Sequence, residues 1–385
     1  MDSPFLRALD NYRIIKDHLY DCSSNLNIDG YSRPDGLGSS ASGMVFAKGK
    51  VNGISVFVKI FQVPCDVQVI IHGTRTIRRT KHSHDINSLE IGLTKYLSDN
   101  FLLPGHTQNI TFLYKMLSCD PAYDVSVSRC TRLPIAPGTL VSNSDTPQYD
   151  LMSRYQEGQL DDRVNLMVVE ECDGDLENLF RAALRDLNSG RLPPETFDSI
   201  WTSILLQLVL TLAMLNDHFD GFYHQDLGPR NILYSVAQGD DTYVSSASHQ
   251  RWDALSHFSY VYKGKEYLVE NTGFVPKLWD FSHVRIGDHV KELVNREEYF
   301  SYLRPQDEIR GHLEGSPIPN LPQLSFQLLK IINELGMSAV LEESKVFKII
   351  NVMSNSDYDN YPLFLELLDT YIPPPEAILI PPRFE

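Results

Sequence analysis

The chain has 385 residues, of which 42% are hydrophobic and 22% are charged, so neither one small core nor a disordered chain is expected, and two lobes or domains are favoured. It contains 34 basic and 50 acidic residues, and the formal net charge of −16 argues against general nucleic-acid binding, which needs Lys and Arg to neutralise phosphate. The five cysteines are scattered and form no CxxC pair, so zinc-ligand spacing is absent and free thiols in a reducing compartment are expected.

Neither export nor membrane insertion is expected. Met1 to Phe5 lacks the basic region followed by an apolar run that a secretory signal would show. The most apolar stretch, residues 199–215, includes Ser203, Gln207 and Thr211 and is shorter than the roughly 20 apolar residues that span a bilayer. It therefore predicts a buried core helix.

The first part of the chain predicts a lead-in followed by strands. Residues 1–30 are expected to be irregular or helical. From Gly36 to Phe61 a Gly- and Ser-rich turn precedes alternating apolar residues, and Asn52-Gly53 is a two-residue hairpin pattern, so three antiparallel strands are expected. Residues 72–84 hold four basic residues and three histidines. A solvated basic loop is expected there, with a phosphate or partner site as the alternative.

The middle of the chain alternates between helical and strand patterns. Residues 88–97 carry apolar residues at helical spacing. Residues 104–164 are expected to form strands with a long surface insertion, and residues 166–169 predict a short buried strand. Helical spacing returns over 176–184, and the prolines at the start of 193–218 open a long predicted helix.

The last part of the chain predicts an insertion and then helices. Residues 235–268 are polar and rich in Tyr, and they are expected to contain a strand pair around Gly264. Three helices are then expected, at about residues 323–336, 338–353 and 361–371. The tail at 373–385 is too rich in proline for regular structure.

A short segment after the long predicted helix carries a pattern that suits phosphoryl transfer. That reaction needs phosphates held, a metal ion fixed and an acceptor hydroxyl aimed in line. In the segment HQDLGPRN (224–231), Asp226 and Asn231 lie five residues apart. A carboxylate there can orient the acceptor hydroxyl, and an amide oxygen can ligate Mg²⁺.

A second carboxylate follows at the end of a predicted strand. Asp280 comes directly after the apolar run FVPKLW (274–279) and can hold Mg²⁺ against nucleotide phosphates. A single Asp in a loop is more often a solvated turn residue. The combination of HxD, Asn at the fifth following position and Asp-Phe after a strand is much harder to obtain by chance.

The upstream parts that phosphate binding requires are present in order. The Gly- and Ser-rich segment before the first predicted strands can bind phosphates, because its small residues let backbone N–H groups approach them. A flexible loop is an equally good interpretation of this segment. Its candidate nucleotide-binding residues are Gly36, Gly38, Ser40, Gly43 and Val45. Lys59 lies within an otherwise apolar strand, where a buried amine requires a charged partner. Glu90, on the following helix, is the expected partner, and a solvent-facing Lys at a strand edge is the alternative.

Taken together, these motifs resemble the signatures of protein kinases. The resemblance implies that Glu170 and Cys172 belong to the hinge that bonds adenine through its backbone, with Val169 in the gatekeeper position. It implies that His224 is the catalytic-loop histidine. The departures described below, and the segment that includes Ile318-Pro319-Asn320, look similar to the kinases of large double-stranded DNA viruses.

The resemblance also implies a fold, cofactors and partners. We expect an α+β, bilobal fold with a small β-rich N-lobe at 31–171 and a larger helical C-lobe at 172–372. The expected cofactors are ATP and Mg²⁺, with Asn231 and Asp280 as metal ligands and Lys59 and Glu90 in the catalytic set. The expected partners are protein substrates, with basic ones favoured by the acidic total charge, and neither nucleic acid nor a membrane. A monomer in the cytoplasm is expected, or in the host cytoplasm or virion if the protein is viral.

The catalytic segment departs from the usual kinase pattern. Gly228 stands where many serine/threonine kinases have a Lys that contacts the transferring phosphate. Arg230 can supply that charge, as an arginine does there in many tyrosine kinases. Pro229 is closer to the serine/threonine pattern, so serine and threonine are favoured as acceptors over tyrosine.

The segments that follow also depart from the pattern. The metal motif ends in Ser282 rather than glycine, which is compatible if the φ angle at that position stays negative. No Ala-Pro-Glu motif ends the activation segment, so residues 283–322 must fill its role differently. No Asp occurs in 324–329, where kinases anchor the catalytic loop from below.

Two other functions compete with a protein kinase. A small-molecule phosphotransferase of the aminoglycoside- or choline-kinase type shares the Asp-to-Asn spacing, but Gln225 and Phe281 stand where those enzymes have a small residue and a tryptophan. A pseudokinase scaffold would account for Gly228 and Ser282. The retention of the Lys and Mg²⁺ positions argues against the scaffold.

Overall fold

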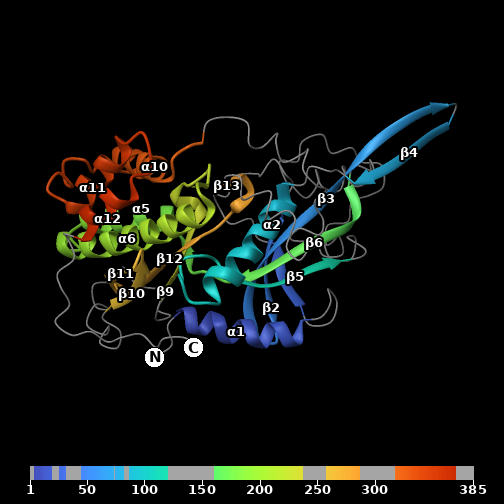
Figure 1. The fold of residues 1–385 in the computed structure, drawn as a ribbon, viewed down its shortest axis with the longest axis horizontal. Coiled ribbons are helices and arrows are strands. Elements are labelled where there is room, and N and C mark those ends of the chain that lie inside the picture. Colours follow the sequence, from blue (N-terminus) through green and yellow to red (C-terminus); the bar gives the residue numbers. More distant parts are fainter. Residues whose placement is uncertain are drawn as a thin grey trace.

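The computed structural model describes residues 4–19, 26–31, 45–72, 74–81, 86–119, 160–236, 257–286 and 317–369. Within these ranges the chain is a mixture of helices and several small sheets, which agrees with the predicted α+β class. Figure 1 shows a sheet-rich region beside a helix-rich region. Their assignment as the two lobes of a kinase stays a prediction.

A six-stranded sheet forms most of the first region. Its main path runs β1-β2-β3-β6-β5 and is antiparallel throughout, with β4 paired to β3. The strands are β1 (Leu26–Tyr31), β2 (Val45–Val51), β3 (Ile54–His72), β4 (Thr74–Lys81), β5 (Leu113–Cys119) and β6 (Leu160–Glu170).

The predicted hairpin at Asn52-Gly53 is confirmed. Asn52 has φ 50° and Gly53 has φ 82°, and the two residues join β2 to β3. Both angles are in the left-handed region that a two-residue hairpin turn demands, which explains why Asn and Gly occupy these positions. The residues of β6 at 166–169 are buried, as predicted.

Two predictions for this region were wrong. Helix α1 agrees with the predicted irregular or helical lead-in, but residues 26–30 of that lead-in belong to the strand β1, which pairs with β2 in the six-stranded sheet. The basic stretch 72–84 is not a loop over its described part, because β4 pairs with the far half of β3 from Cys65–Lys81 to His72–Thr74. The two strands form a long hairpin that projects away from the rest of the molecule (Figure 1).

Helices α1 (Pro4–His18) and α2 (Ile86–Leu97) flank the sheet. α2 confirms the helix predicted at 88–97, and it continues into a π-helical turn, η1 (Ser98–Leu102). α1 packs on β5, and the rings of Phe5 and Tyr12 lie against Phe112 with centroid separations of 6.4 and 5.2 Å.

The helix-rich region is built around α6 (Pro194–Phe219), which confirms the predicted long helix. α6 is long and apolar enough to cross a membrane by composition, but 83% of its most apolar window is buried inside the protein. That burial is the expectation for a core helix. α5 (Leu176–Asn188) packs against it and begins at Asp175, whose side chain caps the backbone N–H of Asn178.

Three helices complete this region: α10 (Asn320–Glu334), α11 (Lys345–Ser354) and α12 (Tyr361–Asp369). The first and third agree with the predicted helices. The second begins seven residues later than the predicted start at 338, because residues 338–344 form turns and Ser344 caps the helix through the N–H of Phe347. The Pro-rich tail at 373–385 lies outside the described residues.

Short strands frame the predicted catalytic segment. The sheet β12-β9-β7 consists of β12 (Phe274–Leu278), β9 (Ile232–Val236) and β7 (Gly174–Asp175), and β8 (Phe222–Tyr223) pairs with β13 (Arg285–Ile286). The predicted strand pair around Gly264 is confirmed as β10 (His257–Tyr262) and β11 (Lys265–Glu270). Residues 120–159 and 237–256, the rest of the two predicted insertions, lie outside the described residues.

Candidate active site

The side chain of Lys59 lies between two carboxylates that come from distant parts of the chain. Its Nζ donates to Oε1 of Glu90 on α2 at 2.5 Å and to Oδ1 of Asp280 at 3.0 Å. Lys59 and Glu90 are fully buried. The expected Lys59–Glu90 pair is therefore present, and the contact with Asp280 is an addition that the sequence did not predict.

An apolar cluster surrounds this ion pair. The Nζ of Lys59 lies 5.3 Å from the ring centroid of Phe61 and 5.2 Å from that of Trp279, and Val169 is buried in the same cluster. Burial by itself would lower the pKa of Lys59, but the charges of Glu90 and Asp280 outweigh it and raise the pKa above its ordinary value. The amine is thus held in its charged form.

Asp280 occupies a strained backbone position that aims its carboxylate at Lys59. Its φ of 60° is in the left-handed region, which is uncommon for residues other than glycine. Burial by itself would raise the pKa of Asp280, but Lys59 and the hydroxyl of Ser282, which donates to Oδ1 at 2.9 Å, hold it below its usual value. Ser282 does not have a positive φ, so the expectation for that position is confirmed.

The loop at 224–231 brings Asp226 and Asn231 together. The Nδ2 of Asn231 donates to the backbone oxygen of Asp226 and to its Oδ2, both at 2.8 Å. Because both partners are acceptors, the amide group must direct its nitrogen at them, which turns Oδ1 the other way. The 3₁₀ turn η3 (Pro229–Asn231) fixes this arrangement, and the N–H of Asn231 donates to the oxygen of Gly228.

His224 ties this loop to the strand that leads into Asp280. The ring of His224 is fully buried, its Nε2 bonds the backbone oxygen of Trp279 at 2.8 Å, and its centroid lies 5.6 Å from that of Phe281. The loop that carries Asp226 is thus bonded to the segment that carries Asp280 through the side chain of His224. Burial lowers the pKa of His224, and the nearby charges of Asp280 and Asp226 oppose that shift.

The start of α10 anchors the loop from the other side. Asn320 accepts from the N–H of His224 at 2.7 Å and donates to the oxygen of Phe222 at 2.7 Å. Gln323 accepts from the N–H of Leu227 and donates to the oxygen of Gln225, both at 2.9 Å.

These two amide side chains anchor the loop, and the sequence did not predict them. The kinase pattern places an Asp within 324–329 for this purpose, whereas here the anchor consists of amides at the first turn of the helix. Asp359 holds that turn in place by accepting from the N–H groups of Asn320 and Leu321 at 2.8 and 2.7 Å.

The predicted hinge residues lie between the sheet and α5. The carboxylate of Glu170 is engaged by Lys277 at 2.9 Å and by the N–H of Phe112 at 2.7 Å, and its own N–H donates to the oxygen of Phe112. Its Oε1 and its backbone N–H are therefore both occupied. Burial raises the pKa of the Cys172 thiol, so the thiol stays protonated at neutral pH.

Two further predicted site residues, Val45 and Arg230, lie within the described ranges. Val45 is the first residue of β2, where its backbone pairs with Ile60. Arg230 is exposed at the surface of η3. The predicted phosphate-loop residues Gly36, Gly38, Ser40 and Gly43 lie outside the described residues, as do residues 287–316 of the predicted activation segment.

The donor set around Asp280 and Asn231 fits a hard divalent cation. Across the described ranges, no three His, Cys, Asp or Glu side chains gather into a metal-binding group. Mg²⁺ is normally held by one or two carboxylate or amide oxygens, with water and phosphate oxygens as the other ligands. Asp280 has a second carboxylate oxygen beyond the one bonded to Lys59, and Asn231 has Oδ1, so the residues fit Mg²⁺ in that mode.

Comparisons with known proteins agree with the kinase resemblance. A protein of Acanthamoeba polyphaga mimivirus described as a putative serine/threonine-protein kinase is 24% identical over 285 residues, which cover 71% of this chain and 67% of that protein. A second protein of that virus with the same description is 28% identical over 141 residues, or 36% of this chain and 26% of that protein. No protein-family model matches the chain. The predicted resemblance to divergent viral kinases is therefore confirmed as a likeness of sequence.

Proposed function

We propose that the chain is an ATP- and Mg²⁺-dependent protein kinase with a bilobal fold. The observation that carries the proposal is the buried Lys59, held between Glu90 and Asp280, while His224 joins the Asp280 segment to the loop of Asp226 and Asn231. A purely structural role does not explain three charged side chains in an apolar cluster, because burying charges usually costs more than their attraction returns.

Each side chain has a distinct part in the proposed reaction. Lys59, fixed by Glu90, binds the α- and β-phosphates, and Asp226 accepts a hydrogen bond from the acceptor hydroxyl and aims it in line. Asn231 and Asp280 hold Mg²⁺, which neutralises phosphate charge when bound. Arg230, exposed beside the loop, supplies positive charge near the transferring phosphate.

Nucleotide binding uses mainly backbone groups. The oxygen of Glu170 and the backbone of Cys172 bond the adenine, since the Glu170 carboxylate is already occupied by Lys277. The Gly- and Ser-rich segment that ends at Val45 covers the phosphates. Val169, which is fully buried, takes the gatekeeper position and limits the depth of the proposed adenine site.

Protein serine and threonine hydroxyls are the proposed acceptors. Pro229 favours them over tyrosine. Both mimiviral relatives are described as putative serine/threonine-protein kinases, which supports the same acceptors. The space beside the α-carbon of Gly228 is open, because a Cβ placed there would meet no atom within 4 Å. We also propose that the protein acts on basic proteins as a monomer in the cytoplasm, or in the host cytoplasm or virion if the protein is viral.

The test is transfer of labelled phosphate from ATP to a panel of basic and acidic proteins, with phosphoamino-acid analysis of the products. We expect phosphoserine and phosphothreonine, and we expect Asp226→Ala and Lys59→Met each to lower the rate by about 100-fold or more, because groups that position and stabilise the transferring phosphoryl typically contribute that much. Lys50→Met, which removes an exposed Lys from β2 in the same sheet, is the matched control and should keep full activity.

Two outcomes would overturn the proposal. Transfer only to sugars or amines would indicate a small-molecule phosphotransferase. Absence of transfer by the folded wild-type protein, with the same biological effect from Asp226→Ala, would indicate a binding scaffold.

A further inference from the structure

The hairpin β10–β11 is inserted between β9 and β12, two strands that a short turn could join. β9 and β12 pair directly as antiparallel neighbours, with Val236 opposite Phe274, yet residues 237–273 lie between them. The described end of this excursion, β10–β11, lies along α6. The oxygens of Glu270 accept from Ser199 and Ser203 at 2.6 and 2.7 Å.

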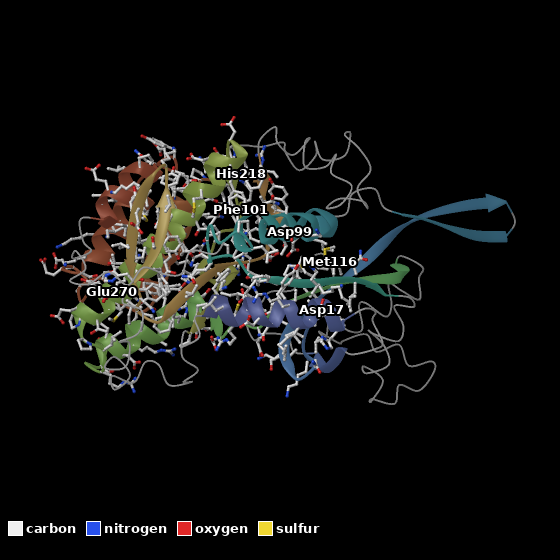
Figure 2. All side chains as sticks on the ribbon, turned by 60° about the horizontal axis from the view of Figure 1, so that its bottom comes forward. Asp17, Asp99, Phe101, Met116, His218 and Glu270 are labelled. Atoms are coloured by element: carbon white, nitrogen blue, oxygen red, sulfur yellow. The ribbon has the colours of Figure 1, made fainter. Side chains whose placement is uncertain are left out.

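The hairpin is fixed to α6 at both of its ends. At its turn, Lys263 pairs with Asp217 near the C-terminal end of α6 at 2.9 Å, whereas Glu270 lies beside the N-terminal half. Figure 2 shows Glu270 well apart from His218, the neighbour of Asp217. A hairpin anchored in this way is a rigid support for the side chains on its inner face.

One of those inner side chains reaches past α6. Tyr260 is 3% exposed, and its hydroxyl donates to Oδ1 of Asn109 at 2.6 Å and lies 3.3 Å from Oε1 of Gln207 on α6. Asn109 belongs to the connector between α2 and β5, so one hydroxyl joins the hairpin, the core helix and the connector.

Asn109 is the centre of a fully buried polar network. Its Nδ2 donates to Gln207 at 3.0 Å and to the backbone oxygen of Pro276 in β12 at 2.9 Å, and its Oδ1 also accepts from Thr107 and Thr211 at 3.3 Å. The Tyr260 contact is the shortest bond to this Oδ1. A buried amide that loses such a donor pays a desolvation penalty or changes its position.

The connector and β12 are joined along their backbones next to the proposed active site. The N–H of Leu278 donates to the oxygen of Asn109 at 2.8 Å, and the N–H of Thr111 donates to the oxygen of Leu278 at 3.1 Å. Leu278 is two residues before Asp280. At its other end the connector follows α2, which carries Glu90, through η1.

The η1 end of the connector is also held by α6. Phe101 packs edge-on against His218 with centroids 4.9 Å apart, and the two are close together in Figure 2. The connector therefore has few ways to move: its start is packed on the C-terminal end of α6, and its middle is bonded through Asn109 to β12.

We propose that Tyr260 is a positioning residue, which acts through Asn109 to hold the carboxylates of Glu90 and Asp280 at their separation across Lys59. In this proposal, the inserted hairpin stabilises the geometry of the proposed active site. The kinetic part of this inference rests on the proposed kinase function, whereas the structural coupling does not.

The test compares Tyr260→Phe with Tyr262→Phe in the full chain. Tyr262 is on the same strand and the same face, and it is also buried, but its hydroxyl interacts with Lys263 and Asp217 at the rim of α6. Both variants lose one hydroxyl from the hairpin. Only Tyr260→Phe removes a bond to the connector.

The first measurement is amide hydrogen exchange, which does not depend on activity. We expect exchange at Thr111 and Leu278 to be about fivefold faster or more in Tyr260→Phe and unchanged in Tyr262→Phe, because a lost hydrogen bond of about 1 kcal/mol corresponds to that factor. Equal exchange in the two variants would overturn the inference.

The second measurement is the dependence of phosphoryl transfer on Mg²⁺ concentration. We expect Tyr260→Phe to need about fivefold more Mg²⁺ for half-maximal rate, because Asp280 is displaced, while Tyr262→Phe matches the wild type. An active wild type with equal Mg²⁺ dependence in both variants would overturn the inference alone. An inactive wild type would overturn the proposed function, and hydrogen exchange would still decide the coupling.

Discussion

The two ring nitrogens of His224 lie in different surroundings. Nε2 faces the carbonyl oxygen of Trp279 at 2.8 Å and must carry a proton to bond it. Nδ1 is buried and has no hydrogen-bond partner within the part of the chain that the structure describes. The neutral ring therefore suits the site, and a proton added to Nδ1 would have no hydrogen-bond acceptor among the described residues.

This arrangement makes stability depend on pH in a definite direction. Burial lowers the pKa of His224, although Trp279 and the nearby Asp280 and Asp226 oppose the shift. The unfolded chain, with an ordinary histidine pKa of about 6.5, takes up a proton before the folded chain does. The contribution of His224 to stability is thus complete above about pH 6.5 and is lost as pH falls below that value.

We expect His224→Gln to flatten the pH dependence of folding. Between about pH 7 and pH 5, the free energy of unfolding from urea titrations should fall less steeply in the variant than in the wild type, by up to about 1.4 kcal/mol per pH unit for one proton. His106→Gln, which changes an exposed histidine, should keep the wild-type slope. A wild-type slope in His224→Gln would mean that the buried ring does not titrate in this range.

At the scale of elements, the first turn of α10 positions the predicted catalytic segment. Asn320 and Gln323 are three residues apart and so face the same side of the helix, from which they bond the backbone on either side of Asp226. Side-chain amides suit this task because each has a donor and an acceptor, and the loop offers both N–H and C=O groups. The loop conformation, including the φ of 66° at Gln225, is thereby held from outside the loop.

Replacing Gln323 by Leu removes two of these bonds at once. We expect a stability loss of about 1–3 kcal/mol and a fall in kcat of about tenfold or more, because Asp226 is no longer held at the acceptor hydroxyl. The affinity for ATP should change little, since Lys59 and the hinge are untouched. Steady-state kinetics and equilibrium nucleotide binding measure the two effects.

The control for this variant is Gln327→Leu, one turn further along α10. It makes the same change in side chain on a partly buried position of the same helix. It should leave kcat unaltered. Equal kcat values in the two variants would show that the α10 contacts support folding alone.

Local sequence patterns predicted elements better than they predicted contacts. The Asn52-Gly53 hairpin, α2, α6 and the strand pair at Gly264 follow from turn chemistry and periodicity, which act within a few residues. β1 was not predicted because its residues, LNIDGY, alternate between apolar and polar over only four positions before Gly30, where the pairing with β2 shifts register. β4 was missed because a basic stretch forms a strand only through its partner in β3, which a local pattern does not contain.

The candidate site shows the same limit. Lys59 and Glu90 were predicted as a pair because a charge in an apolar strand demands a partner, and the structure contains that pair. The clamp of Asn320 and Gln323 was not predictable, since an amide on an amphipathic helix has many possible partners and the loop it bonds is about 96 residues away in sequence. The occupied Glu170 carboxylate was likewise hidden until Lys277 was placed beside it.

At the scale of the whole molecule, contacts between the two regions hold the proposed site together. α1 packs on β5 of the sheet, and Arg7 on the same helix donates to the oxygen of Val236 at the end of β9. Phe112, which contacts α1 through its ring, accepts the N–H of Glu170 with its backbone oxygen. The N-terminal helix thus contacts the sheet and the end of β9, and Phe112 links it to the predicted hinge residue Glu170.

The net charge of −16 acts on substrates over distances larger than any single contact. An acidic protein attracts basic substrates before they bind, and this raises the association rate rather than the rate of chemistry. The effect is screened by salt, since the Debye length falls from about 30 Å at 0.01 M to about 8 Å at 0.15 M ionic strength. We therefore expect kcat/KM for a basic protein substrate to fall by about tenfold over that range, with kcat nearly constant.

This salt dependence can be measured with a Lys-rich peptide and with the same peptide carrying Glu in place of Lys. The acidic peptide should show the opposite trend, and equal salt dependence for both peptides would mean that the total charge of the chain does not steer its substrates.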